Sequence, residues 1–404
     1  MIIKTISGKV LIMNVNDAYL LRSLFAWQTY LLGLLMACAT AGCNSRPAAD
    51  GSVDLVDAID PVDAAQGILD AFDTHPLVAL GEAHGLKEQQ DFVAALIRNP
   101  AFVTKVNAIV LEAGNAKYQN VINRYVAGDS VSPEELQQVW REHTCTALEP
   151  MEPTLNESLF AVVRAVNHAL PPERRLRVLA GDPPIDWSQV RTFKDFVPWL
   201  GQRDRHYAKV VETEILARGN KALLIAGTAH FHRRRLDTGV PNLPLNVVQD
   251  IEKKHPGTVF VVTPHLGFGN RTAELEPRLK SWPRPSLVLL QNTWLGALDT
   301  GSVDSKNEVI FFKNGKNGPQ QPAATQSEIY ADRADAYLYL GPYGTLTMTQ
   351  VPAEIYCDEA YVNELDRRHR LATGRPLDRE KLLKPRPKQW AENLPEKLQM
   401  TFSK

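Results

Sequence analysis

The sequence predicts a single α/β domain with a mainly parallel sheet that is covered by helices on both faces. From residue 63 to residue 374, short apolar runs alternate with amphipathic segments. These apolar runs are continuous, which is typical of parallel strands that are buried on both faces. No internal repeat and no second type of composition interrupts the pattern. We therefore expect one domain of about 310 residues.

The expected elements follow one another along this domain. Strands are expected at Leu77–Leu80, Ala108–Leu111, Leu176–Ala180, Ala222–Ala226 and Thr258–Val262, with later apolar runs at Leu287–Leu290 and Ala336–Leu340. Helices are expected at 64–73, 86–99, 115–128, from 133 onward, and at 156–169, 202–217, 246–254 and 358–374. Gly128 supplies a C-cap glycine, whereas Ser132 and Pro133 are typical of a helix start. Prolines after Gly374 favour an extended tail over residues 375–404.

The near-zero net charge of the chain argues against nucleic acid as a partner. The chain has 404 residues, of which 44% are apolar and 23% are charged, and its formal net charge is −1. A chain of this kind can build a well-packed core and has no long-range attraction to nucleic acid. We expect a small-molecule or peptide substrate and no nucleic-acid partner. Whether the chain is a monomer or a homodimer stays open.

The first 43 residues have the features of a secretion leader. Lys4, Lys9 and Arg22 precede the apolar run LFAWQTYLLGLLMACATAGC, which ends in small residues and is too interrupted for a good spanning helix. Cys38 and Cys43 both stand where a bacterial lipoprotein carries its lipid, and we favour Cys43. Residues 44–62 then form a tether. These features predict a bacterial cell-envelope protein that a lipid anchors to the membrane on the periplasmic face. An ordinary cleaved signal and an uncleaved anchor stay open as alternatives.

Two further cysteines lie inside the expected domain. Export would place Cys145 and Cys357 in an oxidising compartment, where disulfides form and persist. The spacing of two cysteines does not reveal whether they meet in space. A disulfide and two separate thiols therefore both remain open.

Acidic and imidazole side chains follow five of the expected strands. In parallel sheets, ligands bind beyond the carboxyl ends of the strands, so residues at these positions are the first candidates for a site. The residues in question are Glu82 and His84 after the first strand, Glu112 after the second, Asp182 after the third, His230 after the fourth and His265 after the fifth. Because five strands each place an acidic or imidazole side chain at the same edge of the sheet, we expect a pocket there with acid–base chemistry.

Two of these histidines share a local pattern. Gly81-Glu-Ala-His84 and Gly227-Thr-Ala-His230 are both Gly-x-x-His directly after a buried strand. We expect each glycine to let the chain turn sharply out of the sheet. The residues that follow would begin a loop or a helix, whose free N–H groups favour an anion. Each histidine would then point over the edge of the sheet.

Several longer motifs point to a known family. The stretches LGEAHGLKEQQDFVAALI and, after it, IVLEAGN are similar to the opening of the Tiki superfamily proteins, and GTAHFHRRRLDTGVPNLPLNVV resembles the second motif of the ChaN-type members. Glu88 stands where the erythromycin esterase-like members carry a glutamate, RDRHYA from Arg203 is similar to their arginine helix, and RADAYLYLG is similar to their late strand. The resemblance spans Val78 to Leu340 and mixes features of two branches.

The resemblance implies three alternatives for the site. The esterase-like relatives favour a metal-free hydrolase, in which His84, oriented by Glu82, is the general base and Arg203 or His230 stabilises the oxyanion. Tiki proteases favour a divalent Zn, Mn or Fe ion held by His84, His230, Glu112 and Asp182. The ChaN-type lipoproteins favour haem or iron bound by a histidine or tyrosine. A non-catalytic binding domain is expected if these residues fail to converge.

Further residues complete the expected pocket. Glu88, His232 and His265 are candidates beside the main set of Glu82, His84, Glu112, Asp182, Arg203 and His230. The sequence has no Gly-x-Ser-x-Gly motif, which argues against a serine nucleophile of the elbow type. It also has no Cys-x-x-Cys-His motif, which excludes covalently attached haem. The reaction expected from this set is the hydrolysis of an ester or amide bond.

Overall fold

The computed structural model describes residues 2–6, 9–13, 59–148, 153–234, 244–266, 272–300 and 328–393. The chain divides into two units, of which Met1–Val53 is the first and Asp54–Lys404 the second. In the first unit, β1 (Ile2–Ile6) and β2 (Lys9–Met13) pair in antiparallel. The cysteines expected to carry a lipid, Cys38 and Cys43, lie outside the described residues.

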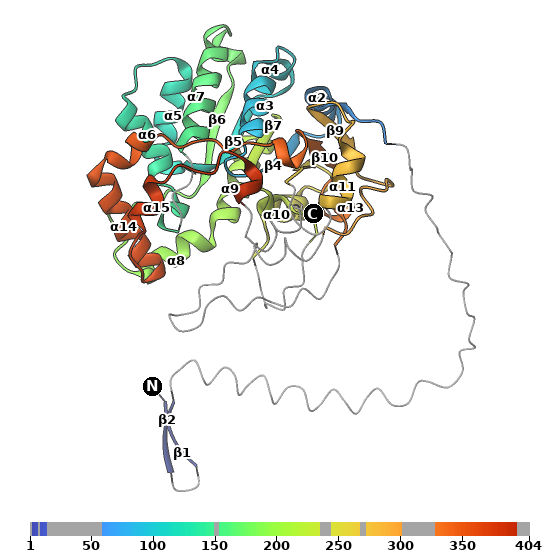
Figure 1. The fold of residues 1–404 in the computed structure, drawn as a ribbon. Coiled ribbons are helices and arrows are strands. Elements are labelled where there is room, and N and C mark those ends of the chain that lie inside the picture. The colour runs from blue at the N-terminus through green and yellow to red at the C-terminus, as the bar shows by residue number, and fades with distance from the viewer. Residues whose placement is uncertain are drawn as a thin grey trace, which may run out of the picture. The chain divides into compact units, whose positions relative to one another are not determined.

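Eight strands form the sheet of the second unit, in the order β3-β9-β10-β8-β4-β7-β5-β6 (Figure 1). In chain order they are β3 (Val62–Asp63), β4 (Leu77–Glu82), β5 (Ala108–Asn115), β6 (Arg177–Asp182), β7 (Ala222–Gly227), β8 (Val259–Pro264), β9 (Ser286–Leu289) and β10 (Ala336–Tyr339). The pairs from β10 through β8, β4, β7 and β5 to β6 are parallel. The mainly parallel sheet is therefore confirmed, with β9 and β3 as antiparallel strands at one edge.

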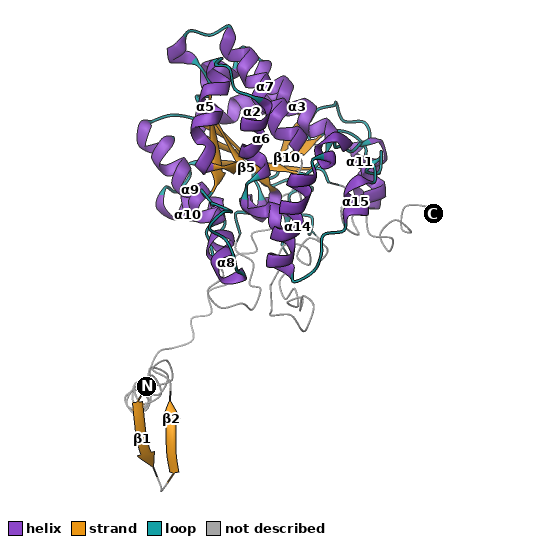
Figure 2. Cartoon of the chain, turned by 90° about the vertical axis from the view of Figure 1, so that its left-hand side faces the viewer, coloured by secondary structure: helices purple, strands orange, loops and turns teal. Residues whose placement is uncertain are grey.

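Helices cover both faces of this sheet (Figure 2). The helices are α2 (Ala64–Thr74), α3 (Lys87–Arg98), α4 (Phe102–Lys105), α5 (Gln119–Ala127), α6 (Pro133–Arg141), α7 (Pro153–His168), α8 (Phe193–Gly201), α9 (Arg203–Glu214), α10 (Val247–Lys254), α11 (Thr272–Leu279), α13 (Tyr330–Arg333), α14 (Glu359–Thr373) and α15 (Arg379–Leu383). The expected caps are present, because Gly128 is left-handed at the end of α5 and the Ser132 hydroxyl accepts from Glu135 N at the start of α6. Both follow the local rules for helix ends.

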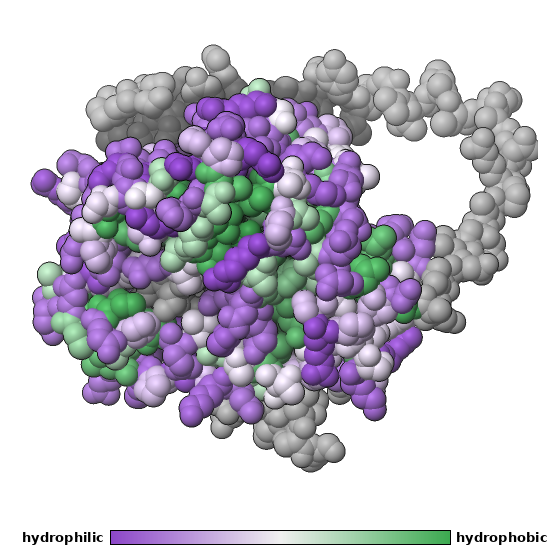
Figure 3. Space-filling view, turned by 90° about the horizontal axis from the view of Figure 1, so that it is seen from above, coloured by the Kyte–Doolittle hydropathy of each residue, from purple (hydrophilic) through white to green (hydrophobic). Residues whose placement is uncertain are grey.

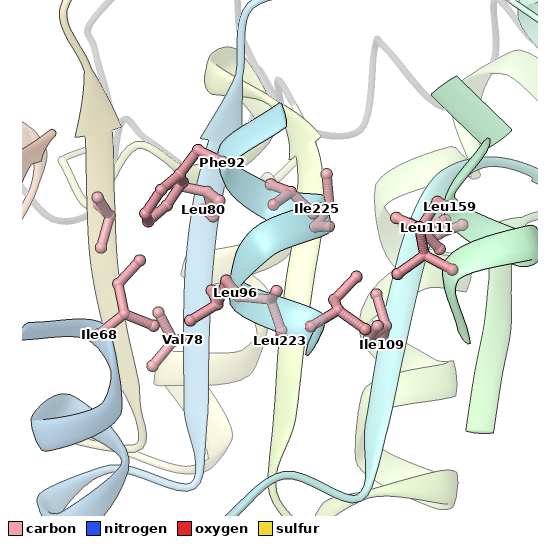
Figure 4. Packing of buried hydrophobic residues seen from close by; sticks show 14 of the residues in the cluster. Ile68, Val78, Leu80, Phe92, Leu96, Ile109, Leu111, Leu159, Leu223 and Ile225 are labelled. Carbon is pink, nitrogen blue, oxygen red and sulfur yellow. The ribbon is translucent and has the colours of Figure 1, made fainter. Parts of the chain in front are cut away.

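Alternate residues of the parallel strands enter two separate hydrophobic cores. On β4, Val78 and Leu80 face one core, whereas Leu77 and Ala79 face the other. Figure 4 shows the first core, in which Phe92 and Leu96 of α3 pack over these strand residues. The second core lies under α9 and α10. Burial on both faces explains why the strand runs are continuously apolar.

The segment after Gly374, for which an extended chain was expected, contains α15 and returns to the domain. Trp390 is buried, its backbone N–H donates to Leu346 O at 2.8 Å, and its indole N–H donates to Leu266 O at 3.0 Å. The prolines before Trp390 therefore do not keep this segment off the core, because a large aromatic side chain is stabilised by burial there.

The surface of the domain is mixed. Seen from above, hydrophobic residues gather in places between hydrophilic ones (Figure 3). The exposed large hydrophobic residues include Val62, Val197, Leu289 and Leu383. Within the part of the chain that the structure describes, no helix combines the length and the apolar character needed to cross a membrane.

Candidate functional site

The carboxyl ends of β4, β7, β5 and β6 lie next to one another, and the predicted polar residues gather there. Glu82 pairs with Gly227 in the β4–β7 register, and Asn115 pairs with Asp182 between β5 and β6. The β5–β6 register shifts between Leu111 and Asn115. Glu112 lies in this irregular stretch, and such bulges redirect side chains.

Glu112 is the centre of the cluster. Its carboxylate is buried, and it accepts from Gly227 N at 2.7 Å and from Arg203 Nη2 at 2.7 Å. His230 Nε2 lies 3.2 Å from the same carboxylate. Burial alone would raise the pKa of Glu112, but the charges of His230 and Arg203 hold it well below its usual range. The ionised form of Glu112 is therefore favoured, and its carboxylate anchors the cluster.

Arg203, at the start of α9, connects two of the carboxylates. Its Nε donates to Asp182 Oδ1 at 2.9 Å while its Nη2 donates to Glu112. The other oxygen of Asp182 accepts from both the backbone N–H and the hydroxyl of Thr144, at 2.6 and 2.7 Å. Both oxygens of Asp182 thus accept hydrogen bonds. A buried carboxylate is tolerated when it is paired and hydrogen-bonded in this way.

A helix from the end of the domain supports Thr144. Thr144 begins a 3-10 helix, Thr144–Ala147, against which α14 packs. From α14, Arg368 Nη1 donates to Arg141 O at 2.7 Å and to the Thr146 hydroxyl at 3.2 Å. Its guanidinium also lies 4.6 Å from the ring centre of Trp187. Arg368 therefore holds the turn that in turn holds Asp182.

His230 is bonded on both ring nitrogens. Nδ1 contacts Asp204 Oδ1, and Nε2 faces Glu112. Burial opposes the charged form, but the charges of Asp204 and Glu112 raise the pKa of His230 to about 10. At neutral pH His230 is an imidazolium that donates to two carboxylates. Both ring N–H groups of His230 therefore already have carboxylate acceptors within the cluster.

His84 is the most exposed member of the cluster, because 46% of its side chain is accessible. Its Nδ1 lies 3.5 Å from Glu82 Oε1. Burial of the ring acts to lower the pKa of His84, but the hydrogen bond and charge of Glu82, together with the charge of Glu112, raise it to about 9. His84 is thus an imidazole at the solvent side of the cluster with an acidic partner on Nδ1.

The glycines of the two Gly-x-x-His motifs have a different role from the one expected. Gly81 and Gly227 lie inside β4 and β7, and the turn after His84 is made by Gly85, whose φ is +90°. A Cβ at Gly81 would stand 2.9 Å from the Thr228 side chain, and one at Gly227 would stand 3.1 Å from His84 Nε2. These two glycines make room for neighbouring side chains, and the sharp turn is left to Gly85.

Tyr207 of α9 bridges two strands below the site. Its hydroxyl donates to Val110 O at 2.7 Å on β5 and accepts from Ile225 N at 3.1 Å on β7. Gly181 leaves room for the ring, because a Cβ there would lie 2.3 Å from it. Tyr207 therefore links β5 and β7 near the end of their pairing, which extends to Leu111 and Ile225.

Three predicted pocket residues have other partners. Glu88 accepts from the backbone N–H and hydroxyl of Thr347 at 2.9 and 2.6 Å. His265 is buried between Tyr337 and Glu276, at 2.5 and 2.8 Å. His232 is buried, and its carbonyl accepts from Asn246 at 2.8 Å. These contacts fix loops and helices around the sheet.

Two residues of the cluster were not among the predicted site residues. Asp204 directly follows Arg203, so the motif RDRHYA already contained it. Thr144 carried no signal in the sequence, because its role depends on a turn that reaches Asp182 across 38 positions of the chain. Cys145, its neighbour, and Cys357 are both free thiols, so the alternative of a disulfide between them is not realised.

The donor atoms do not fit the predicted metal site. Among the residues described, no group of three or more His, Cys, Asp and Glu side chains is arranged to hold a metal ion. Asp182 and Glu112 are bonded to the cation Arg203, and the ring nitrogens of His230 face carboxylates. A cation would have to displace the guanidinium to reach Asp182 and Glu112.

Comparisons with known proteins give likenesses of fold. No family model matches the chain, and no curated protein matches it. An erythromycin esterase, EreC in its open conformation, shares 13% identity with a TM-score of 0.44, over 68% of this chain and 92% of its own. A succinoglycan biosynthesis protein shares 10% identity with a TM-score of 0.48, over 70% of this chain and 94% of its own.

A third solved structure belongs to the other branch that the motifs resemble. The haem-binding protein ChaN of Campylobacter jejuni shares 14% identity with a TM-score of 0.34, over 52% of this chain and 88% of its own. The solved structures that this chain is similar to thus include an erythromycin esterase and a ChaN protein, two branches of the superfamily that its motifs resemble.

Proposed function

We propose that this protein, as a member of the erythromycin esterase and ChaN superfamily, hydrolyses an ester or amide bond without a metal ion. The observation that carries the proposal is the half-exposed imidazole of His84, with Nδ1 toward Glu82 and Nε2 over Gly227. A histidine that is oriented by a carboxylate and reachable from solvent is the arrangement general-base catalysis requires.

In the proposed reaction, His84 Nε2 takes a proton from water as the water oxygen bonds to the substrate carbonyl carbon. Glu82 stabilises the imidazolium that forms. The same proton is then given to the leaving oxygen or nitrogen as its bond to carbon breaks. Water is consumed, and an acid and an alcohol or amine are released, so atoms and charge balance.

Arg203 and His230 have a positioning role in this proposal. Their N–H groups donate to Glu112, Asp182 and Asp204, so they hold the Glu112 carboxylate beside His84. A fixed negative charge there favours the imidazolium that forms on His84 during the reaction.

The test is hydrolysis of an ester and amide library by the purified protein and by His84→Ala. Loss of a general base costs on the order of a hundredfold or more in rate. His168→Ala, which removes an exposed imidazole at the end of α7, is the matched control and should leave the rate unchanged. Activity should persist with a chelator. An inactive parent, or an active His84→Ala, would refute the proposal.

Haem binding is the second candidate function, and the exposure of His84 favours it, since an accessible imidazole is a common axial ligand. Absorption spectra of the protein titrated with haem separate the two candidates. A Soret band that His84→Ala removes would replace hydrolysis by haem binding.

We further propose that the protein is anchored in the bacterial envelope through a lipid on Cys43. The support is the leader-like composition of residues 1–43 and the small residues that precede the cysteine. Cys43→Ser should release the protein from membranes, and Cys38→Ser should not. The opposite result would move the anchor to Cys38.

A further inference from the structure

A cavity of about 490 Å³ lies away from the catalytic cluster. Its lining comes from α2, β3, β8, β9 and the residues beside them, and it includes Asp60, Val62, Asp70, Phe260, Leu287 and Leu289. Volumes of roughly 300–1,000 Å³ are usual for small-molecule sites in proteins. The cavity therefore has the size of a ligand site.

The cavity belongs to a different part of the sheet from the cluster of His84 and Glu112. β3 and β9 form one edge of the sheet, and β10, β8 and β4 separate them from β7 and β5. Phe260 is the second residue of β8, so the cavity reaches the start of this strand, whereas the cluster lies at the carboxyl ends. A ligand here would leave the cluster untouched.

The walls are apolar and firmly packed. Leu287, Val288 and Phe260 are buried in the sheet. α2 lies close against β9 because Gly67 has no side chain, and a Cβ there would stand 2.6 Å from Leu287. A floor of this kind is preformed, so a ligand pays little to organise it.

The mouth leaves apolar side chains in water. Val62 and Leu289 line the cavity, and 49% and 61% of their surfaces are exposed. Both lie on the antiparallel edge strands, β3 and β9. An apolar body placed against them would remove this surface from water, which is favourable in proportion to the area covered.

The charges at the rim are all of one sign. Asp60 and Asp70 line the cavity, and the twelve lining residues include no lysine, arginine or histidine. A positive charge is attracted to a rim of this kind.

We propose that this cavity binds a cationic amphiphile, with its alkyl or aryl body between α2 and β9 and its amine or quaternary ammonium group at Asp60 and Asp70. Anionic amphiphiles are rejected at the same rim. The apolar body supplies most of the affinity, and the two exposed carboxylates select a cationic over an anionic amphiphile.

The test is calorimetric titration of the full chain with decyltrimethylammonium, decyl maltoside and decyl sulfate, each below its micelle concentration. The ammonium probe should bind tightest and the sulfate weakest. Lengthening the ammonium probe from octyl to decyl should raise affinity by about fourfold per methylene. Equal affinity for ammonium and sulfate, or no binding of the ammonium probe, would overturn the proposal.

Variants locate the binding. Leu289→Lys should weaken the ammonium probe several-fold, because it places a positive charge at the mouth. Leu383→Lys, an equally exposed leucine on α15, is the matched control and should change nothing. Asp70→Asn should reduce affinity for the ammonium probe about two- to fivefold and leave that for the maltoside unchanged. If Leu289→Lys and Leu383→Lys changed the affinity for the ammonium probe equally, binding in this cavity would be refuted.

Discussion

The imidazole of His84 lies over Gly227, where a methyl group would come within 3.1 Å of Nε2. The φ of Gly227 is −50°, so alanine fits the backbone and only the side-chain contact changes. Gly227→Ala should therefore push the half-exposed ring of His84 outward and lower kcat at least tenfold, because small misplacements of a catalytic group are costly. Steady-state kinetics on any cleaved library member measure this.

The control for that substitution is Gly201→Ala. Gly201 ends α8, and a Cβ there would meet nothing within 4 Å. Its kcat should equal that of the parent. If Gly227→Ala also kept full kcat, His84 would not act from the position described.

The pKa of His84 sets the expected pH dependence of hydrolysis. A general base works only when deprotonated, and the pKa of His84 is raised to about 9. The rate should rise about tenfold per pH unit below that value and level off near pH 9. Glu82→Gln removes the partner that raises the pKa, so its plateau should begin at lower pH. A flat profile from pH 6 to 9 in the parent would exclude His84 as the base.

Arg203 should carry a large part of the local stability. It is nearly buried between Glu112 and Asp182, so Arg203→Met would leave two carboxylates without their cation. Removing one partner of a buried pair costs about 3–5 kcal/mol of unfolding free energy. Arg218→Ala breaks an exposed pair with Glu214, and it should cost about 0.5 kcal/mol or less. Urea unfolding of both variants measures the contrast.

The pKa of His230 predicts how stability depends on pH. Because this pKa is raised from 6.5 to about 10 on folding, its contribution is fully present below pH 6.5 and is lost as pH rises through 10. The difference in unfolding free energy between the parent and His230→Gln should therefore be larger at pH 6 than at pH 10. An equal difference at both values would show that the charge of His230 does not stabilise the fold.

The positions at strand ends were the part of the site that the sequence could predict. Glu82 and Asp182 are the last residues of β4 and β6, and His230 comes three residues after β7. Glu112 lies in the irregular stretch of β5, so all four residues reach the same edge of the sheet. The rule is local, so it also selected His265, which follows β8 but is bonded to Tyr337 and Glu276. The same pattern thus gives different environments, because the neighbours that the fold supplies decide the outcome.

The support for the site could not be predicted from local patterns. Thr144 reaches Asp182, and Arg368 reaches Thr146, only after distant segments have packed together. The antiparallel direction of β9 was likewise absent from its short apolar run, since four apolar residues fit either direction. The prolines of the tail predicted an extended chain, but they did not reveal that Trp390 is buried in the domain.

The contact of Arg368 with the turn at Thr144–Ala147 means that a truncated protein can keep every site residue and still lose the support of the site. A stop codon placed after Tyr343 would leave every residue of the proposed site encoded, from Glu82 to His230, so that a search for motifs would score the product as intact. The product would nevertheless lack α14, and the turn that binds Asp182 would lose the guanidinium that holds it. Truncated copies of this gene should therefore be judged by whether they retain Arg368.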